Sequence, residues 1–208
     1  MDNTGSFSRY DVYTTVGSIY CYAGTNVLRN RMNIRNNELL KNFESDFYSV
    51  RQAELIKSPI QGRFSASHLC KIHQYLFGDI YPFAGHFRRE DILKGKTRFL
   101  SYTEVPEKTK RTLKLLWDEN LLQNLQYERY IERAAYYMAE LNYIHPFREG
   151  NGRSTREFMR CLFLYAGYQV NWNNVSREYL LSIMEQSIYD YKYLMELLRK
   201  CLSTQADR

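Results

Sequence analysis

The chain has 208 residues, of which 44% are hydrophobic and 25% are charged, with only 4 Pro and 10 Gly. A chain of this length and composition can bury the core of one globular domain, and the scarcity of Pro and Gly excludes a linker-rich protein. The net charge of +6 comes from basic residues scattered along the sequence, so we do not expect nucleic acid as a partner.

The cysteine spacing and the absence of a long apolar run exclude further classes of protein. Cys21, Cys70, Cys161 and Cys201 have no Cys-x-x-Cys spacing, which argues against a zinc site or a redox motif. The sequence has no apolar run of about 18 residues and no basic-then-apolar leader, so we expect neither a membrane span nor a Sec-type signal peptide. The cytoplasm is the expected compartment, and delivery into another cell by a specialised system is compatible with the same sequence.

Apolar residues recur at helical spacing through most of the chain. In chain order, the pattern predicts helices over 38–55 and 65–77, a short hairpin at 90–100, and helices over 104–120, 128–144, 153–166 and 177–202. Ser65 and Ser176 are candidate N-caps for two of these helices. Because strand-like spacing is confined to the hairpin, the sequence predicts an all-α fold with one β-hairpin.

The most informative stretch runs from His145 to Arg156. An apolar helical pattern ends before Pro146, because proline disfavours the helical conformation of the residue that precedes it. A second helical pattern begins near Gly152 or Arg153. The stretch is therefore a tight helix–loop–helix turn, which can bring several polar groups onto one ligand.

The start of the second helix has the features of an anion site. Its free N–H groups and its positive dipole end point into the loop. Gly150 and Gly152 let the backbone approach a phosphate without an intervening Cβ. Arg153 and Arg156 share one face of the first turn, where cations oppose the helix dipole unless an anion lies between them.

Two further residues of the stretch suggest a reaction. Glu149 offers the oxygen ligands that hard divalent cations prefer, and His145 can accept a proton from a hydroxyl. Each residue alone has a structural explanation: a capping histidine, a solvated glutamate, an ordinary Gly-Asn-Gly turn and surface arginines. Their combination favours a site that binds a polyphosphate and a metal ion beside a base.

The stretch also resembles a known signature. It matches, at every defined position, the Fic family motif His-Pro-Phe-x-(Asp/Glu)-Gly-Asn-Gly-Arg-x-x-Arg, and segments 20–30, 62–64 and 77–85 resemble upstream parts of Fic domains. The resemblance implies a Fic-type helical bundle whose hairpin is a flap over the active site. It also implies an N-terminal extension at 1–17, a Fic domain at 18–202 and a C-terminal tail at 203–208.

The implied activity is transfer of AMP from ATP to a Ser, Thr or Tyr hydroxyl of a target protein, with release of pyrophosphate. His145 would be the base, Glu149 would bind Mg²⁺, and Phe147 would anchor the loop in the core. The residues that the resemblance assigns to the nucleotide are Lys94, Gly95, Arg148, Glu149, Gly150, Asn151, Gly152, Arg153 and Arg156. Asn151 would hold the α and β phosphates, Arg153 the β phosphate and Arg156 the γ phosphate.

In the same resemblance, the hairpin aligns the target by strand-like main-chain pairing. The residues assigned to this flap are Thr97, Arg98, Phe99 and Leu100. Transfer of UMP, phosphocholine or phosphate is the alternative within the enzyme class. A non-catalytic Fic-fold binding module is the alternative outside it, although the complete motif argues against loss of activity.

Many Fic proteins are inhibited by a helix with the pattern Ser/Thr-x-x-x-Glu-(Gly/Asn), whose glutamate pairs with the second motif arginine. The best match in this chain begins at Ser182, but it has glutamine at position 186, where the glutamate belongs, and its glutamate one residue early, at 185. We therefore expect a separate, antitoxin-like protein to supply a glutamate to Arg156.

Overall fold

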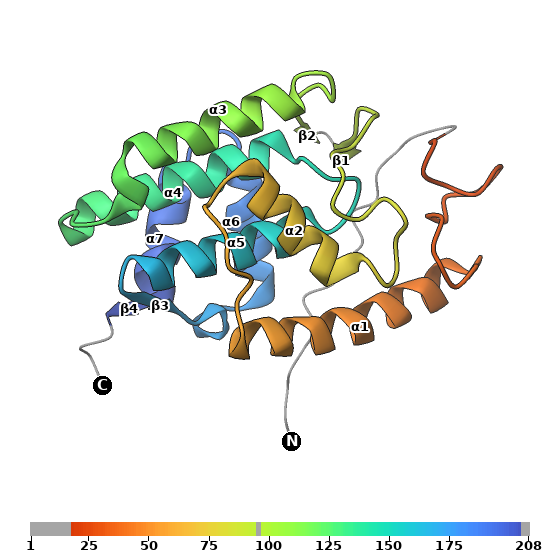
Figure 1. Ribbon diagram of the computed structural model, residues 1–208, viewed down its shortest axis with the longest axis horizontal. Helices are drawn as coiled ribbons and strands as arrows, with labels where there is room; N and C mark the ends of the chain where they lie inside the picture. Colours follow the sequence, from red (N-terminus) through yellow and green to blue (C-terminus); the bar gives the residue numbers. More distant parts are fainter. Residues whose placement is uncertain (1–17, 95–96, 205–208) are drawn as a thin grey trace.

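The computed structural model describes residues 18–94 and 97–204 of the chain, and its fold is mostly helical (Figure 1). The helices are α1 (Asn37–Lys57), α2 (Ala66–Phe77), α3 (Val105–Asp118), α4 (Tyr127–Ile144), α5 (Asn151–Tyr165), α6 (Arg177–Gln186) and α7 (Lys192–Cys201). Two short 3₁₀ turns, Asn120–Leu122 and Trp172–Asn174, connect them. The strands are β1 (Leu93–Lys94), β2 (Thr97–Arg98), β3 (Tyr168–Val170) and β4 (Leu202–Thr204). This architecture confirms the prediction of a helical fold with a small hairpin.

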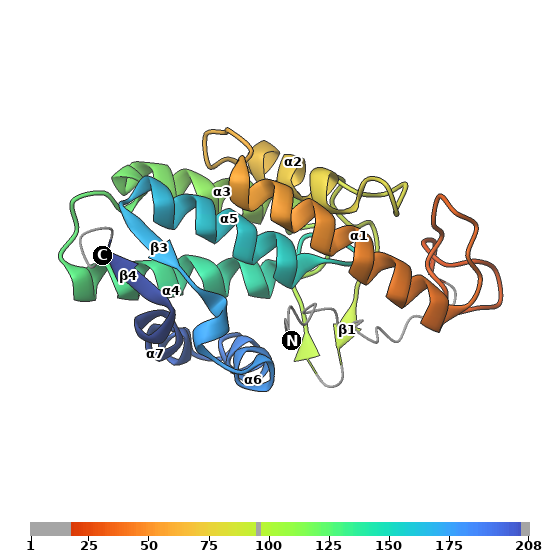
Figure 2. The same cartoon turned by 90° about the horizontal axis from the view of Figure 1, so that it is seen from below.

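Helices α4 and α5 form the centre of the molecule. Helix α4 contacts α3, α5 and α7, while α5 contacts α2, α4 and β3. Figure 2 shows α2 above the α4–α5 pair and α6 and α7 below it, while α1 runs at the level of α5. The β1–β2 hairpin lies at the end of the molecule where α4 turns into α5 (Figure 1).

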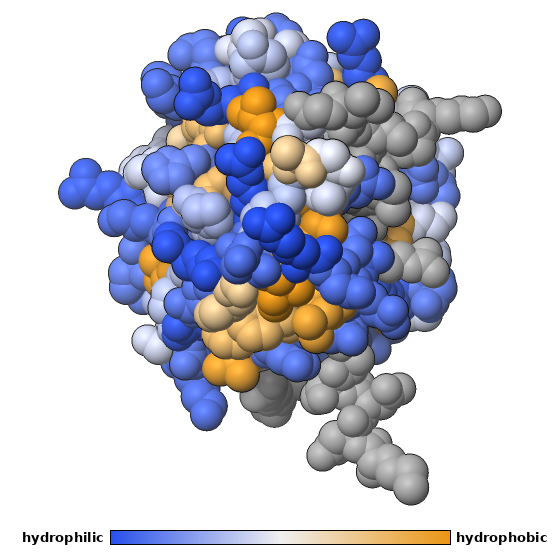
Figure 3. All heavy atoms as spheres, turned by 90° about the vertical axis from the view of Figure 1, so that its right-hand side faces the viewer, coloured by the Kyte–Doolittle hydropathy of each residue, from blue (hydrophilic) through white to orange (hydrophobic). Residues whose placement is uncertain are grey.

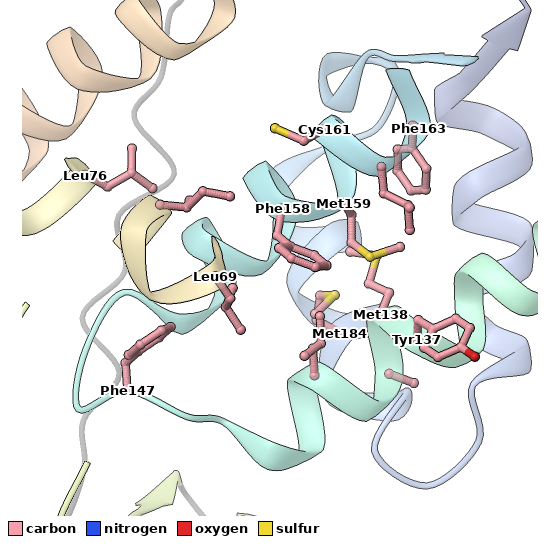
Figure 4. Close-up of a cluster of buried hydrophobic side chains, with 14 of the residues drawn as sticks. Leu69, Leu76, Tyr137, Met138, Phe147, Phe158, Met159, Cys161, Phe163 and Met184 are labelled. Carbon is pink, nitrogen blue, oxygen red and sulfur yellow. The ribbon is translucent and has the colours of Figure 1, made fainter. Parts of the chain in front are cut away.

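The core forms because each central helix is apolar on the side that faces its neighbours. The predicted apolar positions of α4 are all buried: Ile131, Ala134, Ala135, Met138, Leu141 and Ile144. Phe158 and Met159 of α5 lie against Met138 of α4 and Met184 of α6, so that three helices meet in one cluster (Figure 4). Burying such side chains provides the main driving force for folding.

The predicted helix starts are confirmed. The Ser65 hydroxyl accepts a hydrogen bond from the backbone N–H of His68, and the Ser176 hydroxyl accepts one from Tyr179. A side-chain oxygen at this position satisfies one of the unpaired N–H groups of the first turn. Both serines therefore define where α2 and α6 begin.

The prediction of a single helix over 177–202 is wrong, because the chain forms α6 and α7 with a turn between them. The Ser187 hydroxyl and the Asn142 amide both donate to the Met184 carbonyl at the end of α6, at 2.8 and 2.5 Å. The Asp190 side chain accepts from the N–H of Lys192 where α7 begins. Apolar spacing continues across this turn, so periodicity alone could not reveal it.

The prediction that strands are confined to the hairpin is also wrong. Strand β3 pairs with β4 in antiparallel register, with Tyr168 opposite Thr204 and Val170 opposite Leu202. This pairing joins segments far apart in sequence, so no local pattern could indicate it. It also places the predicted boundary between residues 202 and 203 inside β4, while the predicted extension 1–17 lies outside the described residues.

Hydrophilic side chains cover most of the face of the molecule shown in Figure 3, and apolar side chains gather in a patch in its lower middle part. This distribution fits the scattered charge of the sequence. Within residues 18–94 and 97–204, no helix combines the length and the apolarity needed to cross a bilayer.

Candidate active site

His145 ends helix α4 in the left-handed conformation, with φ 47° and ψ 63°. Its imidazole is almost fully buried, and Nδ1 lies 3.1 Å from the carbonyl oxygen of Asn142. A carbonyl can only accept a hydrogen bond, so Nδ1 carries the proton and the lone pair is at Nε2. This tautomer is the one that a general base requires.

The flap packs directly on this histidine. The Phe99 ring is stacked on the imidazole, with 3.7 Å between ring centroids and 19° between their planes. Phe99 is also buried with Ile92 in a small apolar cluster against Ile188. The flap, the base and the segment after α6 are therefore joined by one set of contacts.

The loop after His145 is braced by Phe147 and Asn151. Phe147 is buried, as predicted for an anchor, and stacks on His73 with 3.8 Å between ring centroids. The side-chain Oδ1 of Asn151 accepts from the Phe147 N–H at 2.7 Å, and the side-chain Nδ2 of Asn151 donates to the Phe147 carbonyl at 2.8 Å. Both polar atoms of the Asn151 side chain thus hold the loop, so its backbone N–H is the group that remains for the phosphate contact that the resemblance implies.

His73 of α2 supports the same loop from behind. Its Nδ1 accepts from the Gly85 N–H at 2.8 Å, so Nε2 carries the proton and donates to the Glu149 carbonyl at 2.9 Å. Burial is the main reason that its pKa falls from 6.5 to about 3, although the bond to Glu149 raises it. The ring is therefore neutral in the folded protein at physiological pH.

This buried ring predicts a pH dependence of stability. As the pH falls from 6.5 towards 3, the unfolded chain takes up a proton on His73 and the native protein does not. The contribution of the neutral His73 ring to the free energy of unfolding is fully present above pH 6.5. Below pH 6.5, the free energy of unfolding should fall by roughly 1 kcal/mol per pH unit. Denaturant unfolding between about pH 4 and pH 7 measures the slope. His73→Phe, which can keep the stacking, should have a smaller slope; an equal slope would contradict this origin.

Gly150 is required by both conformation and space. Its φ is +77°, and a Cβ there would lie 2.4 Å from the Phe77 ring. Gly152 is helical, and its Cβ would lie 3.2 Å from the end of the Arg156 side chain. The two glycines of the motif therefore have different tolerance to a methyl group.

Gly150→Ala should lower the free energy of unfolding by about 3 kcal/mol, from left-handed strain and overpacking together. Gly152→Ala is the matched control and should change it by less than about 1 kcal/mol, because alanine favours a helix and Arg156 can move. Thermal or urea unfolding of both variants tests the contrast. Equal destabilisation would mean that Phe77 does not restrict position 150.

Charged side chains are packed tightly at the start of α5. The Arg153 guanidinium lies 2.7 Å from a Glu44 carboxylate oxygen and 3.2 Å from Glu149 Oε1. Tyr81 also donates its hydroxyl proton to Glu44, which is fully buried in α1. Burial opposes the charge of Arg153, but Glu44 and Glu149 hold its pKa above the ordinary value. Arg153 is therefore a fixed cation.

A cleft opens where the flap, the α4–α5 loop and α6 meet. Its lining residues are Thr97, Phe99, Asn142, His145, Glu149, Gly150, Asn151, Gly152, Arg153, Arg156, Leu181, Met184, Glu185 and Ile188. The structure thus brings together nine of the predicted site residues, from the flap and from the His145–Arg156 stretch. The α6 wall was not predicted, because that segment was interpreted as the middle of a longer amphipathic helix.

Three predicted site residues do not line the cleft. Arg148 donates to the Glu90 carboxylate at 2.9 Å, and Glu90 also accepts from the Ser18 hydroxyl, so Arg148 fixes the loop against the N-terminal segment. Arg98 is exposed on β2, and Leu100 joins the flap to α4 by donating its N–H to the Tyr143 carbonyl. The Lys94 side chain and Gly95 lie outside the described residues.

Comparisons with known proteins agree with this geometry. The model of the Fic/DOC family matches residues 63–163. The protein adenylyltransferase VbhT of Bartonella schoenbuchensis is 39% identical over 174 residues, which cover 84% of this chain and 36% of VbhT. The probable protein adenylyltransferase Fic of Salmonella typhimurium is 35% identical over 159 residues, or 76% of this chain and 78% of that protein. The chain belongs to the Fic/DOC family.

Solved Fic structures share the fold. The N-terminal Fic domain of a VirB-translocated effector from Bartonella quintana, which carries bound ADP, matches with a TM-score of 0.84 and 25% identity over 89% of this chain and 95% of that one. BepC of Bartonella tribocorum, with bound AMPPNP, matches with a TM-score of 0.83 and 24% identity over 89% and 97% of the two chains. At its identity, the BepC match shows the fold alone. The Fic chain spans little more than a third of VbhT.

Proposed function

We propose that this Fic chain is a protein adenylyltransferase, which transfers AMP from ATP to a Ser, Thr or Tyr hydroxyl of a target protein. The observation that carries the proposal is one cleft that is lined by His145, by the N-terminus of α5 and by two arginines. The Nδ1 of His145 is engaged by the Asn142 carbonyl, which leaves the lone pair on Nε2. The names of the relatives and the ADP bound to the Bartonella quintana protein support this donor class.

In the proposed reaction, the hydroxyl oxygen of the target attacks the α phosphorus of ATP. A new P–O bond forms while the bond from this phosphorus to the bridging oxygen of the β phosphate breaks, and pyrophosphate leaves. The hydroxyl proton moves to Nε2 of His145, since Nδ1 already donates to Asn142. Positioning and charge neutralisation account for most of the catalysis in such a transfer.

The phosphates are held by the first turn of α5 and its arginines. The N–H groups at the start of a helix lack carbonyl partners within it, and the dipole there favours an anion. Asn151, Gly152 and Arg153 provide these N–H groups at the cleft wall. In the proposal, the Arg153 and Arg156 side chains contact the β and γ phosphates, and Lys94 and Gly95 of the flap complete the nucleotide site.

Mg²⁺ fits this cleft together with the nucleotide. The described residues contain no cluster of three His, Cys, Asp or Glu side chains that could hold a metal ion. Two carboxylates, Glu149 and Glu185, line the cleft, and Mg²⁺ in nucleotide enzymes is held by one or two carboxylates together with phosphates and water. Glu149 would hold the ion, which would supply neutralisation of the phosphate charge.

The flap is proposed to align the target. Thr97 and Phe99 line the cleft while Arg98 is exposed between them, as the alternation of a strand requires. An extended target segment can add to such an edge by main-chain hydrogen bonds. Leu100 would fix the returning arm through its bond to Tyr143.

Incubation with Mg²⁺ and α-labelled ATP, alone and with bacterial and host lysates, tests this function. Label on a protein is the expected result. Label from UTP or from a phosphocholine or γ-phosphate donor, but not from α-labelled ATP, would assign another donor. Binding of ATP with no transfer from any donor would favour the non-catalytic module. Recovery of the labelled target from a bacterial or a host lysate also bears on where the chain acts, since the solved relatives include translocated effectors.

Arg156→Ala should lower the affinity for ATP by about 10-fold or more, because a charge-assisted contact to the γ phosphate is lost. ADP has no γ phosphate and should bind nearly as before. Arg160→Ala is the matched control on the same helix, since Arg160 pairs with Glu157 and does not line the cleft. Titration calorimetry with both nucleotides measures the difference, and equal weakening of ATP and ADP would contradict the placement.

Inhibition by a separate protein is the second part of the proposal. A groove of about 540 Å³ adjoins the cleft, and Arg153 and Arg156 line both. The rest of the groove comes from α1, from later turns of α5 and from the segment 169–173. A partner helix in this groove could direct a glutamate to Arg156, as expected for an antitoxin-like inhibitor.

If the inhibitor is separate, the purified chain alone should transfer AMP, and its expression alone should slow bacterial growth in a manner that depends on His145. The internal alternative is Glu185 of α6, which lines the cleft. An inactive wild type that becomes active as the Glu185→Ala variant would place the inhibitor within the chain instead.

A further inference from the structure

Arg88 is the largest fully buried side chain of the described residues, and it lies beside the end of α4. Its Nε donates to the His145 carbonyl at 2.9 Å, and a terminal nitrogen donates to the Ile144 carbonyl at 3.3 Å. Its backbone N–H donates to the Pro146 carbonyl at 2.9 Å. The last carbonyls of a helix have no partners within it and carry partial negative charge. One buried cation therefore satisfies the backbone of the proposed base.

The same guanidinium holds both arms of the flap. Its first terminal nitrogen donates to the Glu90 carbonyl at 2.8 Å, just before the hairpin, and its second donates to the Leu100 carbonyl, just after it. The Asp91 carboxylate lies 3.6 Å from the first of these nitrogens and also accepts from the Tyr102 N–H. Arg88 thus ties the two ends of the flap to each other and to the end of α4.

We propose that Arg88 is a positioning residue for transfer, which fixes the flap at a set distance from the His145 imidazole. The inference rests on the proposed function. Arg88 does not line the cleft, so it acts through the backbone of His145 and through the flap that carries Phe99. The base and the strand that aligns the target are then set by one side chain, and neither can shift without breaking its bonds.

The geometry requires an arginine. Guanidinium has five N–H donors in a rigid planar fork, and here they reach carbonyls in three separate segments. A lysine ammonium has three donors on one atom and cannot span these carbonyls. Arg88→Lys therefore keeps the charge near the α4 end and removes the link between the flap and the base.

The test compares Arg88→Lys with Arg133→Lys. Arg133 is also largely buried and pairs with Glu119 through two nitrogens, but it lies on the first half of α4 and outside the cleft. Three properties are measured for both variants and the wild type: the affinity for ATP, the rate of AMP transfer, and the exchange rates of flap amides and of amides in the middle of α4.

Arg88→Lys should bind ATP within about twofold of the wild type and lose about 100-fold in transfer, since displacement of reacting groups by about 1 Å has this cost. Flap amides should exchange faster while α4 amides keep their protection. Arg133→Lys should not reduce transfer relative to ATP binding, and it should not speed the exchange of the flap amides relative to those of α4.

Two outcomes would overturn the inference. One is transfer and flap exchange like those of the wild type in Arg88→Lys. The other is faster exchange throughout α4 with parallel loss of ATP binding, which would make Arg88 a residue of general stability. If the wild type transfers no label, the proposed function fails, but the selective exchange of the flap amides still decides whether Arg88 couples the flap to the end of α4.

Discussion

Replacing His145 with asparagine should reduce AMP transfer by about 1,000-fold, because the base that takes the hydroxyl proton is removed. Affinity for ATP should stay close to that of the wild type, since the phosphates are assigned to the start of α5 and to its arginines. Asparagine is chosen because it tolerates the left-handed conformation of this position, and its amide can still donate to the Asn142 carbonyl.

His145→Ala is the companion variant. Alanine also lacks the base, but it adds the cost of a left-handed residue of about 1 kcal/mol and leaves the Phe99 ring without its stacked partner. Transfer of label from α-labelled ATP and equilibrium binding of ATP are measured for both variants. Loss of transfer with retained binding in both supports the assigned role. Transfer at the wild-type rate in His145→Asn would show that another group takes the proton.

The sequence predicted the centre of this site because its information is local. The residues from His145 to Arg156 are contiguous, and one helix end and one helix start bring them together. Because Arg153 and Arg156 are three residues apart, they share one face of the helix, and both line the cleft. The helical spacing of α4 similarly predicted its buried face, since a periodic pattern needs no knowledge of the partner helix.

The supporting residues could not be predicted in this way. His73, Arg88 and Glu44 lie far from the motif in sequence, and their contacts with it exist only in the folded chain. In the sequence, Glu44 follows Phe43 and precedes Ser45 and Asp46, as expected for a solvated helix face. Its complete burial depends on Arg153 and Tyr81, which come from two other segments.

The turn between α6 and α7 was not predicted from the sequence for a related reason. Its capping groups are Ser187 and Asp190 within the segment and Asn142 from α4. A serine and an aspartate in an amphipathic segment are common enough that neither signals a break on its own. Because this turn carries Ile188 to the flap cluster, it also determines one wall of the cleft.

Replacing Glu44 with glutamine should lower the free energy of unfolding by about 4 kcal/mol, because it removes the charge of one partner of a buried ion pair. Glutamine has nearly the same shape and can still accept from Tyr81, but it cannot compensate the charge of Arg153. Of the two carboxylates that pair with Arg153, only that of Glu149 would remain. The affinity for ATP should change as well, since Arg153 lines the cleft.

Glu54→Gln is the matched control for this prediction. Glu54 lies on the same helix and also pairs with an arginine, Arg51, but its side chain is 44% exposed. Exposed pairs contribute little to stability because water and salt screen them, so this variant should unfold like the wild type. Urea unfolding of both variants, with ATP titration of the folded protein, measures the two effects. Equal midpoints for Glu44→Gln and Glu54→Gln would mean that water reaches Arg153 and that Glu44 does not set its position. A large loss of stability with unchanged ATP affinity would mean that Glu44 stabilises the fold but does not position Arg153 for ATP. The phosphate contacts would then come from the backbone of α5 and from Arg156.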